Sequence, residues 1–124
     1  MNEEMNDYFN SMVHNGQWSA DYTLGQIKAY QVWEHSYGSK RYSSELECND
    51  LPQEYEMPNF IKTLRDSGAK TLAVTDASTA LMRGIHHLIS AGCSIAGPCT
   101  VSRTVSRFGV EDTLKLKGIR FTLN

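Results

Sequence analysis

The stretch Lys70–Ser94, KTLAVTDASTALMRGIHHLISAGCS, decides the fold of this 124-residue chain because its hydrophobic pattern changes period once. The first part, KTLAVT, is rich in apolar and β-branched residues and predicts a strand over Lys70–Thr75. The second part predicts a helix from about Ala77 to Ala91, closed by Gly92. The inward face of that helix consists of Leu81, Ile85 and Leu88. A strand that runs into a helix is a building unit of folds in which helices cover a sheet.

The flanking segments supply the other elements of the second half. A helix is predicted over Asn59–Ser67, and extended segments are predicted over Ile95–Arg107 and Thr113–Leu123. The apolar residues of the last strand change parity midway, so we expect a β-bulge near Gly118. That bulge would turn five residues toward the core: Leu114, Leu116, Ile119, Phe121 and Leu123. The order helix, strand, helix, strand, strand predicts an α+β fold, with a three-stranded sheet and helices on one face.

The first 57 residues are predicted to be helical, and they are acidic and rich in aromatic residues. One helix is predicted over Asn2–His14, where Asn15-Gly16 would stop it, and another over Thr23–Tyr37, where Thr23 and Gln26 form a capping-box pattern. The expected apolar stripe of the second helix is Leu24, Ile27, Tyr30, Trp33 and Tyr37. Residues 39–57 have no clear period and are interpreted as a connector. We expect a single domain over 1–124, with an N-terminal helical segment (1–57) and an α/β core (58–124).

The composition excludes several classes of protein. The longest apolar run is far shorter than the roughly 20 residues needed to cross a bilayer, and the opening MNEEMNDYFN is unlike a signal peptide. We therefore expect a cytoplasmic protein that does not engage a membrane. Three cysteines, Cys48, Cys93 and Cys99, are a sparse and odd set for a disulfide scaffold, so reduced thiols are expected.

Two adjacent histidines in the decisive stretch raise the question of a metal or catalytic site. His86 and His87 point about 100° apart on a helix, whereas a helical zinc pair takes i, i+4 spacing. The nearby cysteines do not form a C-x-x-C motif, and neither histidine is aimed at Ser78 as a nucleophile. We interpret His86 as solvated, His87 as a boundary residue, and Cys93 and Cys99 as packed thiols. No catalytic residue, metal ligand or cofactor is predicted.

The turn between the central strand and its helix is a candidate ligand site. Ligands of open α/β sheets bind at the carboxyl ends of strands, and the free amides of a helix N-terminus attract anions. The turn contains no glycine-rich loop, and Asp76 or Ser78 is also explained as a helix N-cap. The anion or ligand site would be formed by Thr75, Asp76, Ser78 and Thr79.

The net charge of −2 conceals a strong division along the chain. Residues 1–60 carry ten acids and three bases, whereas residues 61–124 carry nine bases and four acids. The C-terminal hairpin would present basic residues that either follow a phosphate backbone or keep a sheet edge from pairing: Arg103, Arg107, Lys115, Lys117 and Arg120. The irregular segment would present either a solvated loop or an acidic, aromatic surface for a basic partner: Tyr42, Glu45, Glu47, Asp50, Glu54, Tyr55 and Glu56.

Residues 60–124 also resemble a known group of sequences. The resemblance rests on FIKTLRDSGAKTLAVTDASTALMRGIHHLISAGCSIAG and on the ending KGIRFTLN, with a looser match in GQWSADYTLGQIKAYQVWEHS. The family consists of short, functionally uncharacterised bacterial proteins associated with phages, plasmids and other mobile elements. The resemblance implies no activity and no catalytic residues. It does imply a setting in which compact proteins often bind a host protein, including defence nucleases.

Three functions remain open from the sequence. The first is a non-enzymatic interaction protein, an accessory factor or an inhibitor of a host protein such as a nuclease, which uses the acidic half or an exposed sheet edge. The second is a nucleic-acid-binding protein that uses the basic hairpin. The third is a small-ligand binder or an enzyme at the turn Thr75–Thr79. We predict the first, with a host protein as partner, and leave the oligomeric state open.

Overall fold

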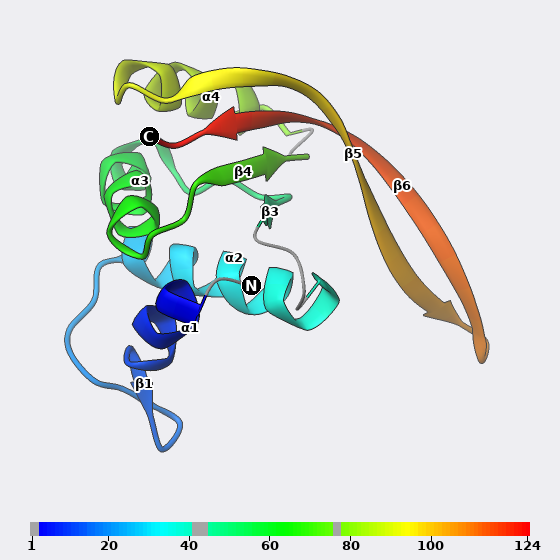
Figure 1. The fold of residues 1–124 in the computed structure, drawn as a ribbon, viewed down its shortest axis with the longest axis horizontal. Helices are drawn as coiled ribbons and strands as arrows, with labels where there is room; N and C mark the ends of the chain where they lie inside the picture. The colour runs from blue at the N-terminus through cyan, green and yellow to red at the C-terminus, as the bar shows by residue number, and fades with distance from the viewer. Residues whose placement is uncertain (1–2, 41–44, 76–77) are drawn as a thin grey trace.

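A computed structural model describes residues 3–40, 45–75 and 78–124 (Figure 1). The helices are α1 (Glu3–Asn10), α2 (Leu24–Lys40), α3 (Met57–Asp66) and α4 (Ala80–Ser90), and a 3-10 turn, η1 (Glu54–Glu56), leads into α3. The strands are β1 (Val13–His14), β2 (Gln17–Trp18), β3 (Leu46–Cys48), β4 (Thr71–Val74), β5 (Ser94–Arg107) and β6 (Val110–Thr122). Helices and strands are both present in one chain, so the predicted α+β class is confirmed.

The main sheet has four strands in the order β3-β4-β6-β5. β3 is parallel to β4, and the other neighbouring strands are antiparallel. The predicted three-stranded sheet was wrong because it missed β3, which lies in the segment interpreted as a connector. β3 has only three residues, with Glu47 at its centre, and it pairs with a strand distant in sequence. A local hydrophobic period does not reveal a strand of that kind.

The hydrophobic core lies on one face of this sheet. The strand register places Leu46, Leu72 and Phe121 side by side, and all three are fully buried. They belong to one cluster with buried side chains from α1, α2, α3 and α4. Because the strand residues of the cluster share one face, the helices reach the sheet from that side.

The start of α2 follows the predicted capping box. The hydroxyl oxygen of Thr23 accepts a hydrogen bond from the backbone N–H of Gln26 at 3.2 Å. In return, the side-chain oxygen of Gln26 accepts one from the backbone N–H of Thr23 at 2.8 Å. Two amides that the helix cannot satisfy internally are therefore paired.

The predicted apolar stripe of α2 was partly wrong. Leu24 is 62% exposed, and Ile27 and Tyr30 are only half-buried. The described face that enters the core consists of Gly25, Ala29, Val32, Trp33 and Ser36. A Cβ on Gly25 would meet the carbonyl oxygen of Glu56 at 2.6 Å, so small residues here let α2 approach the segment before α3 closely.

The end of the first helix also differs from the prediction. α1 stops at Asn10 rather than His14, and a small antiparallel hairpin pairs Val13 with Trp18. Its turn consists of Asn15 (φ 51°) and Gly16 (φ 75°), which both have left-handed backbone. Asn-Gly favours a two-residue hairpin turn of this handedness, so the dipeptide is a hairpin signal rather than only a helix stop.

The decisive stretch folds as a strand followed by a helix, with shifted bounds. β4 covers Thr71–Val74 within the predicted strand. α4 begins at Ala80, three residues later than predicted, and Gly92 (φ 90°) follows its end. α3 begins at Met57, earlier than predicted, because Pro58 in its first turn lacks an N–H where no intrahelical bond is required.

β5 and β6 form a hairpin much longer than the sheet to which it belongs. β4 pairs with β6 only from Ile119 to Thr122, whereas the β5–β6 register continues out to Arg107 and Val110. Residues 99–118, which we call the arm, therefore extend beyond the other strands and project from the body, bending downward in the view of Figure 1. The arm ends in a two-residue turn, Phe108 (φ 52°) and Gly109 (φ 79°).

The predicted bulge near Gly118 was wrong. The register irregularity lies in β5, between Ile95 and Gly97, and β6 is regular through Gly118. Leu114 and Leu116 therefore lie on the opposite face of β6 from Phe121. The change of parity occurs where β6 stops pairing with β4. In the body, the apolar residues of β6 face the core. In the arm, its apolar residues lie on the opposite face of the strand.

Candidate functional site

The arm has one apolar face and one polar face. Directly paired residues of antiparallel strands share a face, and the register assigns every position of the arm to one side or the other. The apolar face carries Val101, Val105, Val110, Leu114 and Leu116, together with Arg103, Arg107 and Asp112. The polar face carries Thr100, Ser102, Thr104, Ser106, Glu111, Thr113, Lys115 and Lys117.

Exposure of the apolar face rises toward the tip. Val101, at the base, is 2% exposed, whereas Leu114 is 36% and Val110 is 66% exposed. Phe108, in the turn, is fully exposed. A solvent-facing aromatic ring beside a row of exposed aliphatic residues is the kind of surface that marks an interaction site.

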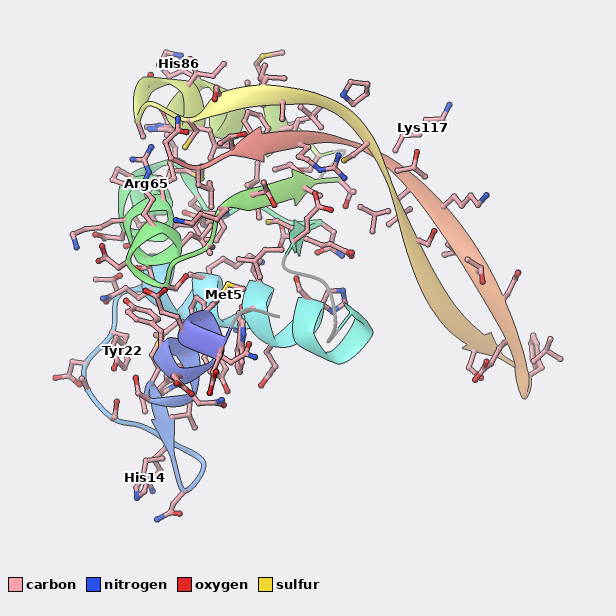
Figure 2. All side chains as sticks on the ribbon, viewed as in Figure 1. Met5, His14, Tyr22, Arg65, His86 and Lys117 are labelled. Atoms are coloured by element: carbon pink, nitrogen blue, oxygen red, sulfur yellow. The ribbon has the colours of Figure 1, made fainter. Side chains whose placement is uncertain are left out.

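The five basic residues predicted to form one surface are divided in the structure. The register places Arg103 and Arg107 on the apolar face and Lys115 and Lys117 on the polar face. Figure 2 shows Lys117 projecting from the arm, away from the body. Arg120 lies in the body, where its Nη2 donates to Glu45 Oε2 at 3.1 Å and its Nε donates to Glu45 Oε1. These hydrogen bonds raise the pKa of the Arg120 guanidinium.

The predicted acidic and aromatic surface is largely engaged within the molecule. Glu45 binds Arg120, and Glu47 is buried in β3. Asp50 forms an ion pair with Lys28 at 3.2 Å. Tyr55 is exposed, whereas Tyr42 lies outside the described residues.

Two further acids of that set bind groups from other elements. Glu54 Oε1 lies 3.3 Å from His87 Nε2 on α4. Glu56 Oε2 accepts a hydrogen bond from the backbone N–H of Gly25 at 2.8 Å, and Asn59 donates to the same oxygen at 3.3 Å. These acids connect the irregular segment to α2, α3 and α4, which gives them a structural role.

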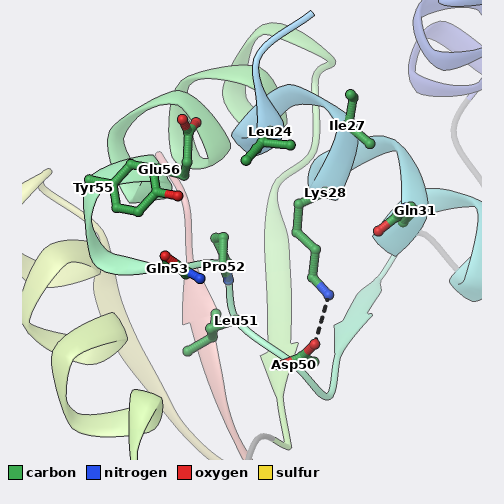
Figure 3. A pocket seen from close by; sticks show the side chains of 10 residues that line it. All are labelled: Leu24, Ile27, Lys28, Gln31, Asp50, Leu51, Pro52, Gln53, Tyr55 and Glu56. Atoms are coloured by element: carbon green, nitrogen blue, oxygen red, sulfur yellow. Dashed lines mark hydrogen bonds and ion pairs between the residues drawn. The ribbon is translucent and has the colours of Figure 1, made fainter.

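A groove of about 380 Å³ lies between α2 and residues 50–56 (Figure 3). The side chains of Leu24, Leu51 and Tyr55 supply its apolar wall, and the Lys28–Asp50 ion pair crosses one end. Its polar lining residues are Lys28, Gln31, Asp50, Gln53 and Glu56, of which Lys28 and Asp50 bind each other.

The predicted ligand turn is only partly described. Thr75 donates its backbone N–H to the carbonyl oxygen of Cys48 at 2.9 Å, which continues the pairing of β4 with β3. Thr79 is the N-cap residue of α4, without a side-chain capping bond, and the Ser78 carbonyl accepts from the N–H of Leu81 at 3.2 Å. Asp76 lies outside the described residues.

The histidines lie as the sequence predicted. His86 is exposed on the outer side of α4 (Figure 2), and His87 is half-buried beside Glu54. Their ring planes are nearly perpendicular, with centroids 5.8 Å apart. No cluster of three or more potential metal ligands occurs in the described part of the chain.

The cysteines and the helices were the last features for which the sequence made a prediction. All three cysteines are reduced, with Cys48 and Cys93 buried and Cys99 half-buried. Arg65 Nη2 donates to Cys93 Sγ at 3.4 Å, and its Nε donates to the carbonyl oxygen of Leu123 at 2.6 Å. Among the helices of the described ranges, none is long and apolar enough to cross a membrane.

The amphipathic arm was not predicted as a site, because charge along the chain does not indicate which residues share a face of the hairpin. A signal was present: Leu114 and Leu116 share a parity that is opposite to that of Ile119 and Phe121. Without a bulge, that pattern indicates a strand whose apolar residues lie on one face in its first part and on the opposite face in its second part. In the structure this strand leaves the body of the domain partway along its length, where β4 ends.

The fold and its most distinctive surface define the class of protein: an α+β domain with a projecting, amphipathic two-stranded arm. Residues 28–123 match the family described as a domain of unknown function (DUF7698), and the chain belongs to that family. The matched residues include the whole arm and begin within α2. No curated protein and no solved structure matches the chain.

Proposed function

We propose that this protein is a non-enzymatic interaction module that binds another protein through the apolar face and the tip of its arm. The proposal is based on one observation: the apolar side chains near the end of the arm are exposed to solvent. Val110, Leu114 and Phe108 are all exposed on a structure that projects from the body. Burial of such side chains stabilises a complex by about 25 cal/mol per Å² of apolar surface removed from water.

The geometry of the arm supports a binding role over a purely structural one. A two-stranded ribbon is marginally stable in water, and it requires further strands or a packing partner for rigidity. β4 supplies a third strand only at the base of the hairpin, from Ile119 onward. A partner protein that covers the outer part would supply the missing contacts.

A second candidate function is nucleic-acid binding, and the four cations of the arm favour it. A two-stranded ribbon fits a DNA groove, and exposed phenylalanine side chains can wedge between bases. Two observations weigh against this alternative: the cations are divided between opposite faces, and Glu111 and Asp112 follow directly after the tip. Acidic side chains at that place would repel the phosphate backbone.

A mobile-element setting, which the resemblance of residues 60–124 implies, would make the partner a host protein. An inhibitor of a host nuclease is one such role, because a projecting ribbon can enter a cleft that a compact domain cannot. The third alternative, a ligand or active site at Thr75–Thr79, has weaker support, since Thr75 is engaged with β3 through its backbone.

The test is a comparison of arm variants in pull-down experiments from host lysate. Phe108→Ser and Leu114→Ser remove exposed apolar groups, and Ser102→Lys alters an exposed position on the polar face as the matched control. We expect a stoichiometric partner that is retained by the wild type and by Ser102→Lys and lost from both serine variants. Absence of a partner, or equal binding by all four proteins, would overturn the proposal.

Ionic strength separates the protein and nucleic-acid alternatives. Raising it from about 0.1 M to about 1 M shortens the Debye length from about 10 Å to about 3 Å. Binding through an apolar face persists under that change, whereas binding to four or more phosphates weakens by orders of magnitude. A nucleic-acid complex that forms at about 50 mM salt and disappears with Lys115→Ala and Lys117→Ala would favour the second candidate.

A further inference from the structure

No strand that the structure describes pairs with the outer edge of β6 in the arm. In the described chain, β4 pairs with β6 only from Ile119 to Thr122, and β5 occupies the other edge of β6. From Val110 to Lys117, alternate residues therefore direct their N–H and C=O groups away from β5. The backbone N–H of Thr113 donates to Asp112 Oδ1 at 2.9 Å, so pairing there requires this carboxylate to turn aside. Figure 1 shows this part of β6 along the side of the arm that faces away from the helices. An open edge of this kind is a template for pairing with another strand.

We propose that two copies of this chain associate through this edge, with β6 of one copy antiparallel to β6 of the other. The charges along β6 are complementary in this arrangement. Glu111, Lys115 and Lys117 alternate with apolar positions along β6 and share the polar face. An antiparallel arrangement brings the acid-bearing end of one strand next to the basic end of the other.

The side-chain pattern selects one register. A two-fold axis must keep the two apolar faces on the same side, so residues of equal parity are paired across the interface. Centring on Thr113 places Glu111 opposite Lys115 of the second copy and Val110 opposite Leu116 of the second copy, each pair occurring twice. Thr113 then lies opposite Thr113 of the second copy, which is also a favourable cross-strand pair.

Neighbouring registers are less favourable. Centring on Asp112 or on Lys115 would place like charges opposite each other at the axis, which is destabilising. Centring on Leu114 gives two Glu111–Lys117 pairs and one Leu114–Leu114 pair but places Val110 opposite Gly118, so it has one apolar pair where the Thr113 register has two. The Thr113 register therefore combines the largest number of favourable pairs.

The edge of β5 lacks these properties. Its charged residues, Arg103 and Arg107, are both basic, so pairing β5 with itself offers no acid to complement them. Pro98 has no N–H, and the irregularity between Ile95 and Gly97 distorts the strand near the body. These features protect an edge from association. The self-complementary edge is therefore that of β6.

Association of this kind is independent of the proposed function, although the two are compatible. Pairing uses backbone groups at the edge and leaves the apolar faces of both arms directed to the same side. The dimer would present a four-stranded platform that carries Val110 and Leu114 from each copy. The small area joined by one strand pair predicts a weak dimer, since stable interfaces usually bury more than about 1,000 Å².

Sedimentation velocity of the full chain from about 1 to about 200 μM tests the proposal, because weak dimers dissociate in this range. We expect the mass to rise with concentration from 13.9 kDa toward twice that value. Lys115→Glu should weaken association by at least about tenfold, because two attractive pairs become repulsive. Glu111→Lys should act similarly, and the double variant should restore association. Lys117→Glu makes the same charge change outside the central pairs and is the matched control.

A cross-linking experiment tests the register. Thr113→Cys in a Cys99→Ser background should form an intermolecular disulfide under mild oxidation, because the two-fold axis brings the two thiols together. Ser102→Cys in the same background should not. The proposal would be overturned if the protein stayed monomeric at all concentrations. It would also be overturned if Lys115→Glu and the double variant dimerised as strongly as the wild type. Phe108→Ser should leave the mass unchanged while it abolishes partner capture, so failure of the dimer and failure of the proposed function are distinguishable.

Discussion

Gly118 lies against the carbonyl oxygen of Val74 so closely that a Cβ on Gly118 would stand 2.5 Å from it. The same Cβ would stand 2.9 Å from Cγ2 of Thr75. Val74 is the last residue of β4 and pairs with Ile119, so this contact marks the point where the arm leaves the body. The absence of a side chain at Gly118 lets β4 end directly beside the base of the arm.

Gly118→Ala should therefore destabilise the protein by about 1–3 kcal/mol, the usual cost of forcing an extra methyl group into a packed place. Backbone atoms oppose the new methyl group, and they cannot rotate away as a flexible side chain can. Urea denaturation measures the loss, and Ser102→Ala, at an exposed position of the arm, is the control. An unchanged free energy of unfolding in Gly118→Ala would mean that β4 and the arm are not in contact.

The two faces of α2 give a second prediction. Val32 is buried in the core, whereas Leu24, which begins the apolar stripe expected from sequence, is 62% exposed. Val32→Ala should cost about 2 kcal/mol because it removes two buried methyl groups and leaves a cavity. Leu24→Ala should change the free energy of unfolding by no more than about 0.5 kcal/mol. A larger loss from Leu24→Ala than from Val32→Ala would contradict the observed orientation of the helix.

Elements specified by neighbouring residues were predictable from the sequence, whereas elements specified by distant residues were not. The capping box of Thr23 and Gln26, the strand at Thr71–Val74 and the helix after it were predictable, because neighbouring residues specify them. β3 was not, because three residues centred on Glu47 become a strand only through pairing with β4. The buried face of α2 was also mispredicted, since it depends on which elements pack against the helix.

The candidate surface illustrates the same limit. The sequence indicated the basic residues of the hairpin but not that the strand register divides them between two faces. It indicated the acids of residues 45–56 but not that Asp50 pairs with Lys28 and Glu54 with His87. Charge counted along a chain does not report which charges are neutralised by residues distant in sequence.

The environment of Cys93 predicts a dependence of stability on pH. Burial raises the pKa of the Cys93 thiol, although the Arg65 guanidinium, which donates to its sulfur, acts in the opposite direction. The native protein therefore keeps this proton at pH values where the unfolded chain, with an ordinary thiol pKa of about 8.5, has lost it. The resulting contribution to stability is fully present below about pH 8.5 and is lost as the pH rises through the higher pKa of the folded state.

Urea denaturation between about pH 8 and pH 10 measures this contribution, over the range in which a thiol of ordinary pKa ionises. The free energy of unfolding should fall less steeply with pH in Cys93→Ala than in the wild type. Cys99, which is half-buried, should react first with a thiol reagent, and Cys93 should react only on unfolding. Equal slopes in the two proteins, together with rapid modification of Cys93 in the native state, would contradict the assignment.

The Asn15-Gly16 turn gives a last prediction, which separates backbone strain from steric contact. Gly16 has a φ of 75°, and no atom lies within 4 Å of a Cβ placed on it. Gly16→Ala should therefore lose about 1–2 kcal/mol through the left-handed backbone alone, whereas Gly118→Ala loses stability through a clash. Asparagine tolerates the left-handed region better than alanine, so Gly16→Asn should recover part of the loss. If Gly16→Ala and Gly16→Asn unfold at the same urea concentration, side-chain identity does not control the turn, and its handedness cannot be what fixes the β1–β2 hairpin.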